Sequence, residues 1–255
     1  MVEHEIRWAA HQLDGCAVVR PEGELDPITY RGFGEDLAEF AMRLPRAVIV
    51  AVDDLRVWAE PLLTIFANVW MRVGERPGVP ILLVAEDPEV RGLYEHSAVR
   101  RFVPVHESVS AAVAAADRPA PHRHDTLTLA RTDDCARRAR RFVDEACRNW
   151  QVMEVFADAE LVVTELVENA LAHSRAGTEI SVRVELRQDL LTVAVRDDDP
   201  REAVLHEPLP GETHLYGLHV VARLAHGWGC APRVPTGKVV WAALPTGTEA
   251  GRQFG

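Results

Sequence analysis

The order of predicted helices and strands changes at residues 118–126, RPAPHRHDT, and this change most constrains how the chain can fold. The segment joins two prolines with polar residues, a composition typical of a linker. Before it, short segments rich in Val and Ile alternate with segments of helical periodicity; after it, two long helical patterns come first and strands follow. The sequence therefore predicts two domains, and 255 residues are enough to give each a core.

Residues 1–117 have the pattern of an α/β domain, in which helices cover a sheet. Four short segments rich in Val or Ile predict strands, and four segments with apolar residues at helical spacing predict helices. The predicted strands are 16–25, 46–55, 79–86 and 101–105, and the predicted helices are 28–44, 61–75, 89–99 and 108–117.

Residues 127–245 have a different, α+β pattern. Apolar and polar residues alternate in EISVRVELR, 179–187, and in LLTVAVRD, 190–197, which predicts two strands joined by a turn at Gln188 and Asp189. We expect a two-layer sandwich with helices on one face of a mainly antiparallel sheet. The other predicted elements are helices at 132–150, 156–174 and 217–227, strands at 227–234 and 237–244, and a flexible tail at 246–255.

Composition and charge exclude several classes of function. The net charge is −11 and neither half is basic, which speaks against non-specific nucleic-acid binding. No apolar run approaches the roughly 18 to 20 residues that span a bilayer, and the N-terminus lacks the features of a signal peptide, so we expect a cytoplasmic protein without a membrane segment. Four scattered cysteines favour free thiols over disulfides or a zinc site. The one lysine, Lys238, among many arginines is interpreted as compositional bias without mechanistic weight.

The helix predicted at 156–174 contains ELVVTELVENALAHS, in which Glu165, Asn169 and His173 lie four residues apart and share one stripe. Asparagine is mildly unfavourable inside a helix, so helix formation does not explain Asn169. Its amide oxygen is a suitable ligand for Mg²⁺, and Glu165 one turn earlier can accept a proton from a substrate hydroxyl. Alternatively, the stripe is a solvated face, with His173 near the C-terminal end of the helix where the dipole favours it.

Three further segments follow in an order that favours a nucleotide site. VRDDDP, residues 195–200, ends a strand and offers Asp197 as an acceptor for an exocyclic amine such as that of adenine. YGLHVVARL, residues 216–224, begins a helix at a glycine, and such a helix N-terminus favours a phosphate. GKVVWAAL, residues 237–244, supplies a closing strand.

With these segments in this order, residues 127–245 resemble the ATP-binding domain of Bergerat type shared by histidine kinases, Hsp90, type II topoisomerases and, most closely, the anti-sigma-factor serine kinases of bacteria. ELVVTELVENALAHS resembles the asparagine box of that family, VRDDDP its first glycine box and YGL its second. The resemblance implies binding of ATP with Mg²⁺ and a protein serine/threonine kinase activity.

The resemblance also assigns roles to single residues. Glu165 would be the catalytic base that activates a substrate serine or threonine, and Asn169 would be the magnesium ligand. Asp197 would recognise adenine, and the backbone amides at the second glycine box would meet the phosphates. The residues that the resemblance places at ATP are Asn169, Asp197, Asp199, Gly217 and Leu218. Residues 201–214 would form a mobile lid over the nucleotide.

Three positions depart from the family pattern. Asp199 stands where the first glycine box has a glycine, and it adds negative charge near an anionic nucleotide. Leu215 replaces the first glycine of the second box, and a residue with a Cβ cannot take positive φ cheaply. Val239 stands where a threonine often supports the adenine site. These departures leave open whether ATP is bound or hydrolysed.

The order of elements in residues 1–117 resembles a STAS domain, the fold of anti-sigma factor antagonists. The resemblance depends on GELD, on RAVIVAVDDLRVW and on VPILLVAE. STAS antagonists have a phosphoacceptor serine at the start of the helix after the third strand, and Pro61, which has no hydroxyl, stands at that place. Thr64, one turn further along, is a weak candidate acceptor, so we expect this half to act as a docking or regulatory module.

Together these resemblances imply a bacterial partner-switching regulator of transcription, of the kind found in stress responses. Its partners would be a sigma factor, a separate STAS-domain antagonist, or both, and a homodimer is allowed because related kinases commonly pair. Two alternatives stay open: a non-catalytic binding module that keeps both folds, and an ATPase unrelated to sigma control.

Overall fold

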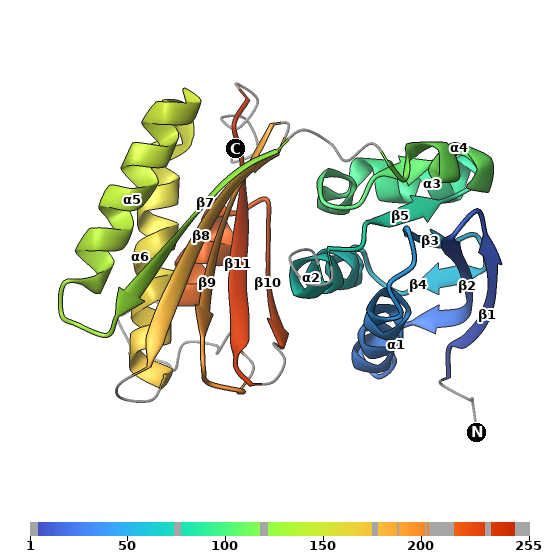
Figure 1. The fold of residues 1–255 in the computed structure, drawn as a ribbon, viewed down its shortest axis with the longest axis horizontal. Helices are drawn as coiled ribbons and strands as arrows, with labels where there is room; N and C mark the ends of the chain where they lie inside the picture. Colours follow the sequence, from blue (N-terminus) through green and yellow to red (C-terminus); the bar gives the residue numbers. More distant parts are fainter. Residues whose placement is uncertain are drawn as a thin grey trace. The chain divides into compact units, whose positions relative to one another are not determined.

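The computed structural model describes residues 5–73, 78–117, 122–174, 178–187, 189–201, 203, 217–232 and 236–247. The chain divides into two compact units, Met1–Pro119 and Ala120–Gly255 (Figure 1). Each unit is described by itself below.

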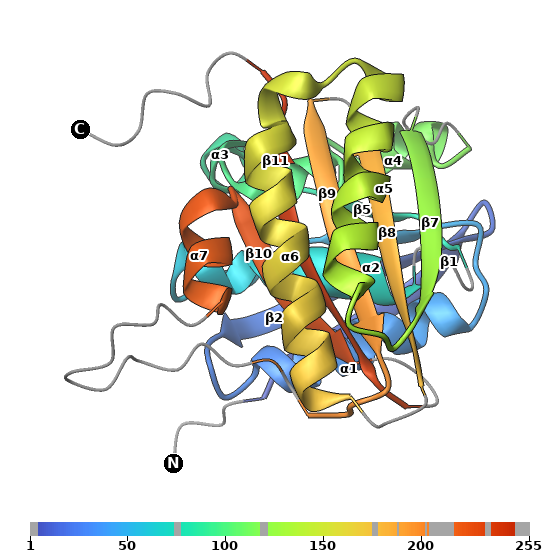
Figure 2. The ribbon, with the colours of Figure 1, turned by 90° about the vertical axis from the view of Figure 1, so that its left-hand side faces the viewer.

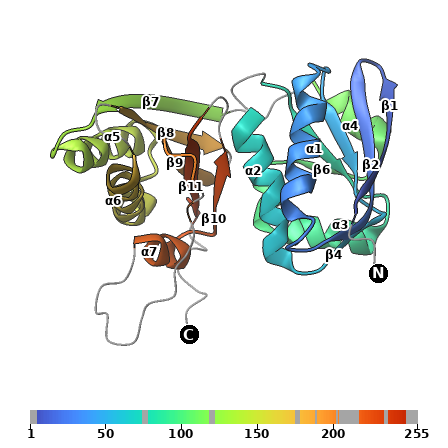
Figure 3. The same ribbon diagram turned by 90° about the horizontal axis from the view of Figure 1, so that it is seen from below.

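The first unit has the predicted α/β architecture. Its described residues form a six-stranded sheet in the order β1-β2-β3-β5-β6, with β4 paired to β2. β1 is antiparallel to β2, and the other pairs are parallel, as crossover helices require. Helix α4 covers a core that contains Ile49, Leu82 and Ala112, while α1 and α2 pack side by side along the sheet (Figure 3).

The elements of the first unit have the following bounds: β1 Arg7–Leu13, β2 Cys16–Leu25, α1 Tyr30–Met42, β3 Val48–Ala51, β4 Leu55–Val57, the 3₁₀ helix η1 Glu60–Leu63, α2 Thr64–Val73, β5 Ile81–Val84, α3 Pro88–His96, η2 Ala98–Arg101, β6 Val105–His106 and α4 Val109–Ala115.

The second unit is the predicted α+β two-layer sandwich. Its described strands form an antiparallel sheet in the order β10-β11-β9-β8-β7. Helices α5, α6 and α7 lie side by side over one face of it (Figure 2). Apolar residues at alternate positions of the strands, such as Val182, Val193 and Val240, meet Val163 and Leu166 of α6 in one core.

The elements of the second unit have the following bounds: β7 His122–Ala130, α5 Cys135–Trp150, η3 Met153–Val155, α6 Phe156–His173, β8 Glu179–Arg187, β9 Leu190–Asp197, α7 Gly217–Leu224, β10 Gly227–Pro232 and β11 Lys238–Pro245.

Some expected boundaries differ from the observed ones. Residues 122–126, expected in the linker, are the first part of β7, whereas 118–121 lie outside the described residues. The segment 46–55 contains β3 and ends on the first residue of β4, because the chain turns between the two strands. Of the expected tail, residues 248–255 also lie outside the described part. Within the residues that the structure describes, no helix combines the length and the apolar character that crossing a membrane requires.

Candidate functional site

Helix α6 positions the first two side chains of the site. It packs on β9 and β11 through its apolar stripe, and Glu165 and Asn169 lie beside that stripe, partly buried. His173, at the C-terminal end of the helix, is exposed. The expected stripe is therefore present, and two of its three side chains turn toward the interior.

The carboxylate of Glu165 lies against the start of α7. A Cβ added to Gly217 would overlap Glu165 Oε2, so only glycine leaves room for the acid at this close approach of the two helices. Burial raises the pKa of Glu165, and the negative charge of Glu168 adds to the rise. A carboxylate with a raised pKa beside a helix N-terminus is suited to accept a proton from a hydroxyl group.

Asn169 has a buried side-chain oxygen, Oδ1. Its Oδ1 lacks a hydrogen-bond partner within the described part of the chain. A buried acceptor without a partner is costly, so its retention points to a ligand. An amide oxygen suits Mg²⁺, which takes few protein ligands and several from waters and phosphates.

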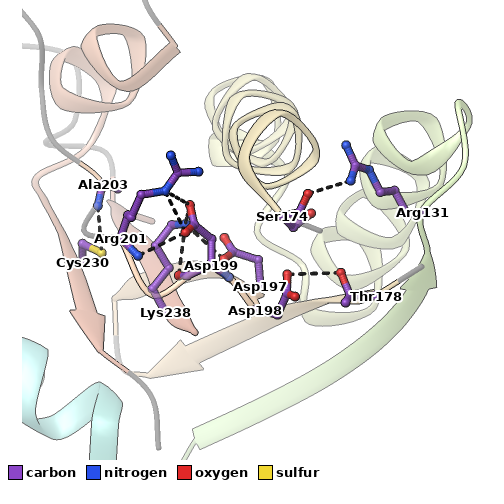
Figure 4. Close-up of polar contacts among 10 residues, drawn as sticks. All are labelled: Arg131, Ser174, Thr178, Asp197, Asp198, Asp199, Arg201, Ala203, Cys230 and Lys238. Atoms are coloured by element: carbon purple, nitrogen blue, oxygen red, sulfur yellow. Dashed lines mark hydrogen bonds and ion pairs between the residues drawn. The ribbon is translucent and has the colours of Figure 1, made fainter. Parts of the chain in front are cut away.

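Asp197, the last residue of β9, is almost fully buried and interacts with the first residue of β11 (Figure 4). Its Oδ1 accepts hydrogen bonds from Lys238 Nζ at 3.0 Å and from the backbone N–H of Asp199 at 2.8 Å. Its Oδ2 is buried and has no hydrogen-bond partner among the described residues. Burial raises the pKa of Asp197, and the two hydrogen bonds at Oδ1 oppose that rise.

Asp199 is also nearly buried, and two basic side chains neutralise its charge. Arg201 Nε donates to Asp199 Oδ1 at 3.0 Å, and Lys238 Nζ lies 3.3 Å from Asp199 Oδ2. The hydrogen bond from Arg201 holds the pKa of Asp199 well below its usual range, and Lys238 adds to this effect. The charge that Asp199 was expected to add near a nucleotide is therefore compensated within the protein.

Lys238 is the residue of this site that sequence reasoning missed. In the register of the sheet it stands opposite Asp197, whereas Val239 stands opposite Arg196. Because side chains alternate along a strand, Lys238 and Val240 share the helix-facing side of β11, and Val239 does not. The structure thus puts Lys238, not Val239, beside the carboxylate of Asp197.

Gly217 and Leu218 form the first turn of α7, as the resemblance to the second glycine box implies. Leu218 is buried in the core, which anchors this helix start against α6. Leu215 lies outside the described residues, as does the expected lid at 201–214 except for Arg201 and Ala203.

The oxygen atoms that the side chains of this site offer fit a magnesium nucleotide. Two buried oxygens without a hydrogen-bond partner in the described part of the chain, Asn169 Oδ1 and Asp197 Oδ2, match an acceptor for a cation and an acceptor for an exocyclic amine. Among the described residues no group of three His, Cys, Asp or Glu side chains gathers as a metal site. Mg²⁺ held at Asn169 would thus depend on oxygens brought by the nucleotide.

In the first unit, Thr64 begins α2 directly after η1, which contains Pro61. Thr64 Oγ1 donates to the carbonyl oxygen of Pro61 at 2.7 Å and lies 3.1 Å from Tyr30 Oη. Tyr30 Oη in turn accepts from Asn68 Nδ2 at 2.9 Å. The hydroxyl of Thr64 is thus engaged in a local network at the N-terminal end of α2.

Comparison with family models finds a match for the second unit. Residues 128–244 match the family model of the histidine kinase-like ATPase domain, which confirms the resemblance of the second unit. A search of curated proteins finds no match.

Solved structures resemble the N-terminal part of the chain in fold. An anti-sigma factor antagonist from Mycobacterium paratuberculosis is 20% identical with a TM-score of 0.39, over 45% of this chain and 97% of that one. The Bacillus cell fate determinant SpoIIAA in its phosphorylated form is 15% identical with a TM-score of 0.31, over 42% of this chain and 97% of that one.

Proposed function

We propose, on the premise that residues 128–244 are a histidine kinase-like ATPase domain, that the chain binds Mg-ATP and acts in the cytoplasm as a partner-switching regulator of a sigma factor. It would phosphorylate a serine or threonine of a separate STAS-domain antagonist. The first unit, with its STAS-like order of elements, would provide docking or regulation.

The observation that carries the proposal is a pair of buried oxygens, Asn169 Oδ1 and Asp197 Oδ2, for which the residues that the structure describes provide no hydrogen-bond partner. Each is costly in the protein alone, and a magnesium nucleotide satisfies both. Asn169 would bind the cation and Asp197 the base, one at each end of the same ligand.

Glu165 is the candidate catalytic base. Its raised pKa favours proton uptake, and Gly217 lets its carboxylate lie directly at the start of α7. The backbone amides of that first turn are suited to hold phosphate oxygens. Bound ATP would supply the γ-phosphoryl group; the chain's own part is to orient the acceptor hydroxyl and take its proton.

We do not expect the second unit to phosphorylate the first. Pro61 has no hydroxyl, and the hydroxyl of Thr64 is engaged with Pro61 and Tyr30. The acceptor is therefore sought in a different polypeptide.

The test is to incubate the purified chain with Mg²⁺, γ-labelled ATP and each STAS-domain protein encoded in the same genome. We expect label on a serine or threonine of at least one of them, and none when Glu165→Gln replaces the wild type. If ATP binds with Mg²⁺ but no STAS protein is labelled, the non-catalytic binding module replaces the kinase. Pro61 stands at the place of the STAS phosphoacceptor and has no hydroxyl, which favours that second candidate.

A further inference from the structure

The chain's single lysine, Lys238, is buried, with 2% of its surface exposed. A buried ammonium is costly unless its donors are all satisfied. Lys238 Nζ has three acceptors within reach: Asp197 Oδ1 at 3.0 Å, Asp199 Oδ2 at 3.3 Å and the carbonyl oxygen of Asp199 at 3.4 Å. Every N–H of the ammonium can therefore be paired inside the protein.

This arrangement divides the two oxygens of Asp197. Oδ1 accepts from Lys238 and from the backbone N–H of Asp199, while Oδ2 is buried and accepts from no described residue (Figure 4). The carboxylate thus keeps one oxygen for the protein and leaves the other for a ligand.

A lysine produces this division and an arginine would not. Arginine presents a planar fork that binds both oxygens of one carboxylate, whereas an ammonium is a point donor. All other Lys/Arg positions of the chain are arginine, so lysine at this one position is the exception. Gly237 lets β11 approach the backbone of Asp197 closely, since a Cβ there would overlap the carbonyl oxygen of Asp197.

We propose that Lys238 is a positioning residue for nucleobase selection: by occupying Asp197 Oδ1 it leaves Oδ2 as the one acceptor, which favours a purine with a 6-amino group over one with a 6-oxo group. This inference rests on the proposed nucleotide binding. An ionised carboxylate accepts but does not donate, so a 6-oxo oxygen would face Oδ2 acceptor to acceptor and leave both unpaired.

The test is the ratio of the affinities for ATP and ITP, which differ in the 6-substituent. For the wild type we expect ATP to bind at least about tenfold more tightly, the effect of one hydrogen bond to a charged group. In Lys238→Arg the guanidinium covers both oxygens of Asp197, and the ratio falls toward one. In Lys238→Met the carboxyl of Asp197 keeps only the hydrogen bond from the backbone N–H of Asp199, takes up a proton and can donate to a 6-oxo group, so the ratio also falls below that of the wild type.

Arg141→Gln is the control. It removes an exposed basic side chain of α5 that pairs with Glu145 at 2.9 Å, without touching Asp197 or Asp199. We expect its ratio to equal that of the wild type. A wild-type ratio in both Lys238 variants, or an equal fall in Arg141→Gln, would overturn the inference. If the wild type binds neither nucleotide, the proposed function itself fails.

A second readout needs no substitution. Because the chain has one lysine, lysine labelled with ¹³C at its ε-carbon gives one side-chain NMR signal, that of Lys238. We expect this signal to shift on titration with ATP and to shift less with ITP at equal occupancy. An unmoved signal at saturating ATP would contradict the inference even if the variants fail to fold.

Discussion

The carboxylate of Glu165 on α6 lies so close to the α-carbon of Gly217 on α7 that no larger residue fits at that position without moving the acid. The candidate base, Glu165, and the helix start that would bind phosphate, at Gly217, therefore pack directly against each other. Changes at Gly217 should act on chemistry more than on the fold.

Gly217→Ala tests this directly. The added Cβ meets the end of a flexible side chain, so we expect the free energy of unfolding to change by less than about 1 kcal/mol while phosphate transfer falls strongly. Thermal unfolding and the transfer assay measure the two effects. Gly32→Ala in α1, where an added Cβ meets nothing within 4 Å, is the control and should leave transfer unchanged.

Glu165→Gln should stabilise the protein while it removes transfer. A raised pKa means that the protonated acid is favoured by folding; this contribution is present below the ordinary glutamate pKa of about 4.3 and is lost as pH rises through the raised folded value. We expect a melting temperature on the order of 2 °C higher than wild type at pH 7, and a difference that shrinks as pH falls through the raised folded value and is lost below about 4.3.

Glu168→Gln provides a graded control for that experiment. Glu168 is exposed and contributes only the smaller, electrostatic part of the shift, so its replacement should give a smaller gain. If the melting temperature of Glu165→Gln at pH 7 were equal to or below that of the wild type, the carboxylate of Glu165 would not be desolvated in the folded protein.

Asn169→Ala should separate binding from stability. Its buried oxygen has no partner among the described residues, and alanine is the better helix former, so the unfolding free energy should be unchanged or rise by up to about 0.7 kcal/mol. Magnesium-dependent ATP affinity should fall at least about tenfold.

Asn68→Ala is the matched contrast to Asn169→Ala. Asn68, in α2, donates to Tyr30 Oη at 2.9 Å, so its replacement should cost about 1 kcal/mol and leave ATP affinity unchanged. If Asn169→Ala destabilised the protein as much as Asn68→Ala and left ATP binding intact, its oxygen would be structural.

Gly237→Ala should destabilise the second unit. Gly237 has φ of +101°, and an added Cβ would overlap the carbonyl oxygen of Asp197, a backbone atom that cannot move cheaply. We expect a loss of roughly 2 kcal/mol in denaturant unfolding. Gly247→Ala, where nothing lies within 4 Å, should stay within about 0.5 kcal/mol of wild type; equal losses at both positions would refute the close approach.

The sequence predicts the buried strands β8 and β9 well, and it misses two edge strands, β1 and β7. The predicted segments 179–187 and 190–197 coincide with β8 and β9, because strands with one face in the core alternate apolar and polar residues. β1 and β7 were not predicted, and each forms an edge of its sheet. β1 is exposed at nearly every position and β7 begins with His, Arg, His and Asp, so neither shows that alternation clearly.

The candidate site was predictable where its chemistry lies within one segment. Glu165 and Asn169 stand out from the helical spacing alone, and Asp197 from the end of a strand. The role of Lys238 depends on the register between β9 and β11, which joins residues far apart in the chain. Composition alone suggested no role for the one lysine, because burial and pairing are properties of the folded sheet.

Equilibrium dialysis of the wild-type chain against labelled ATP, with and without Mg²⁺, decides whether the chain binds a magnesium nucleotide. Asn169 Oδ1 and Asp197 Oδ2, which have no hydrogen-bond partner among the described residues, predict saturable binding of one ATP per chain that strengthens with Mg²⁺ and is lost in Asp197→Asn combined with Asn169→Ala. Equal labelled ATP on both sides of the membrane at saturating concentration and with Mg²⁺ present would contradict it.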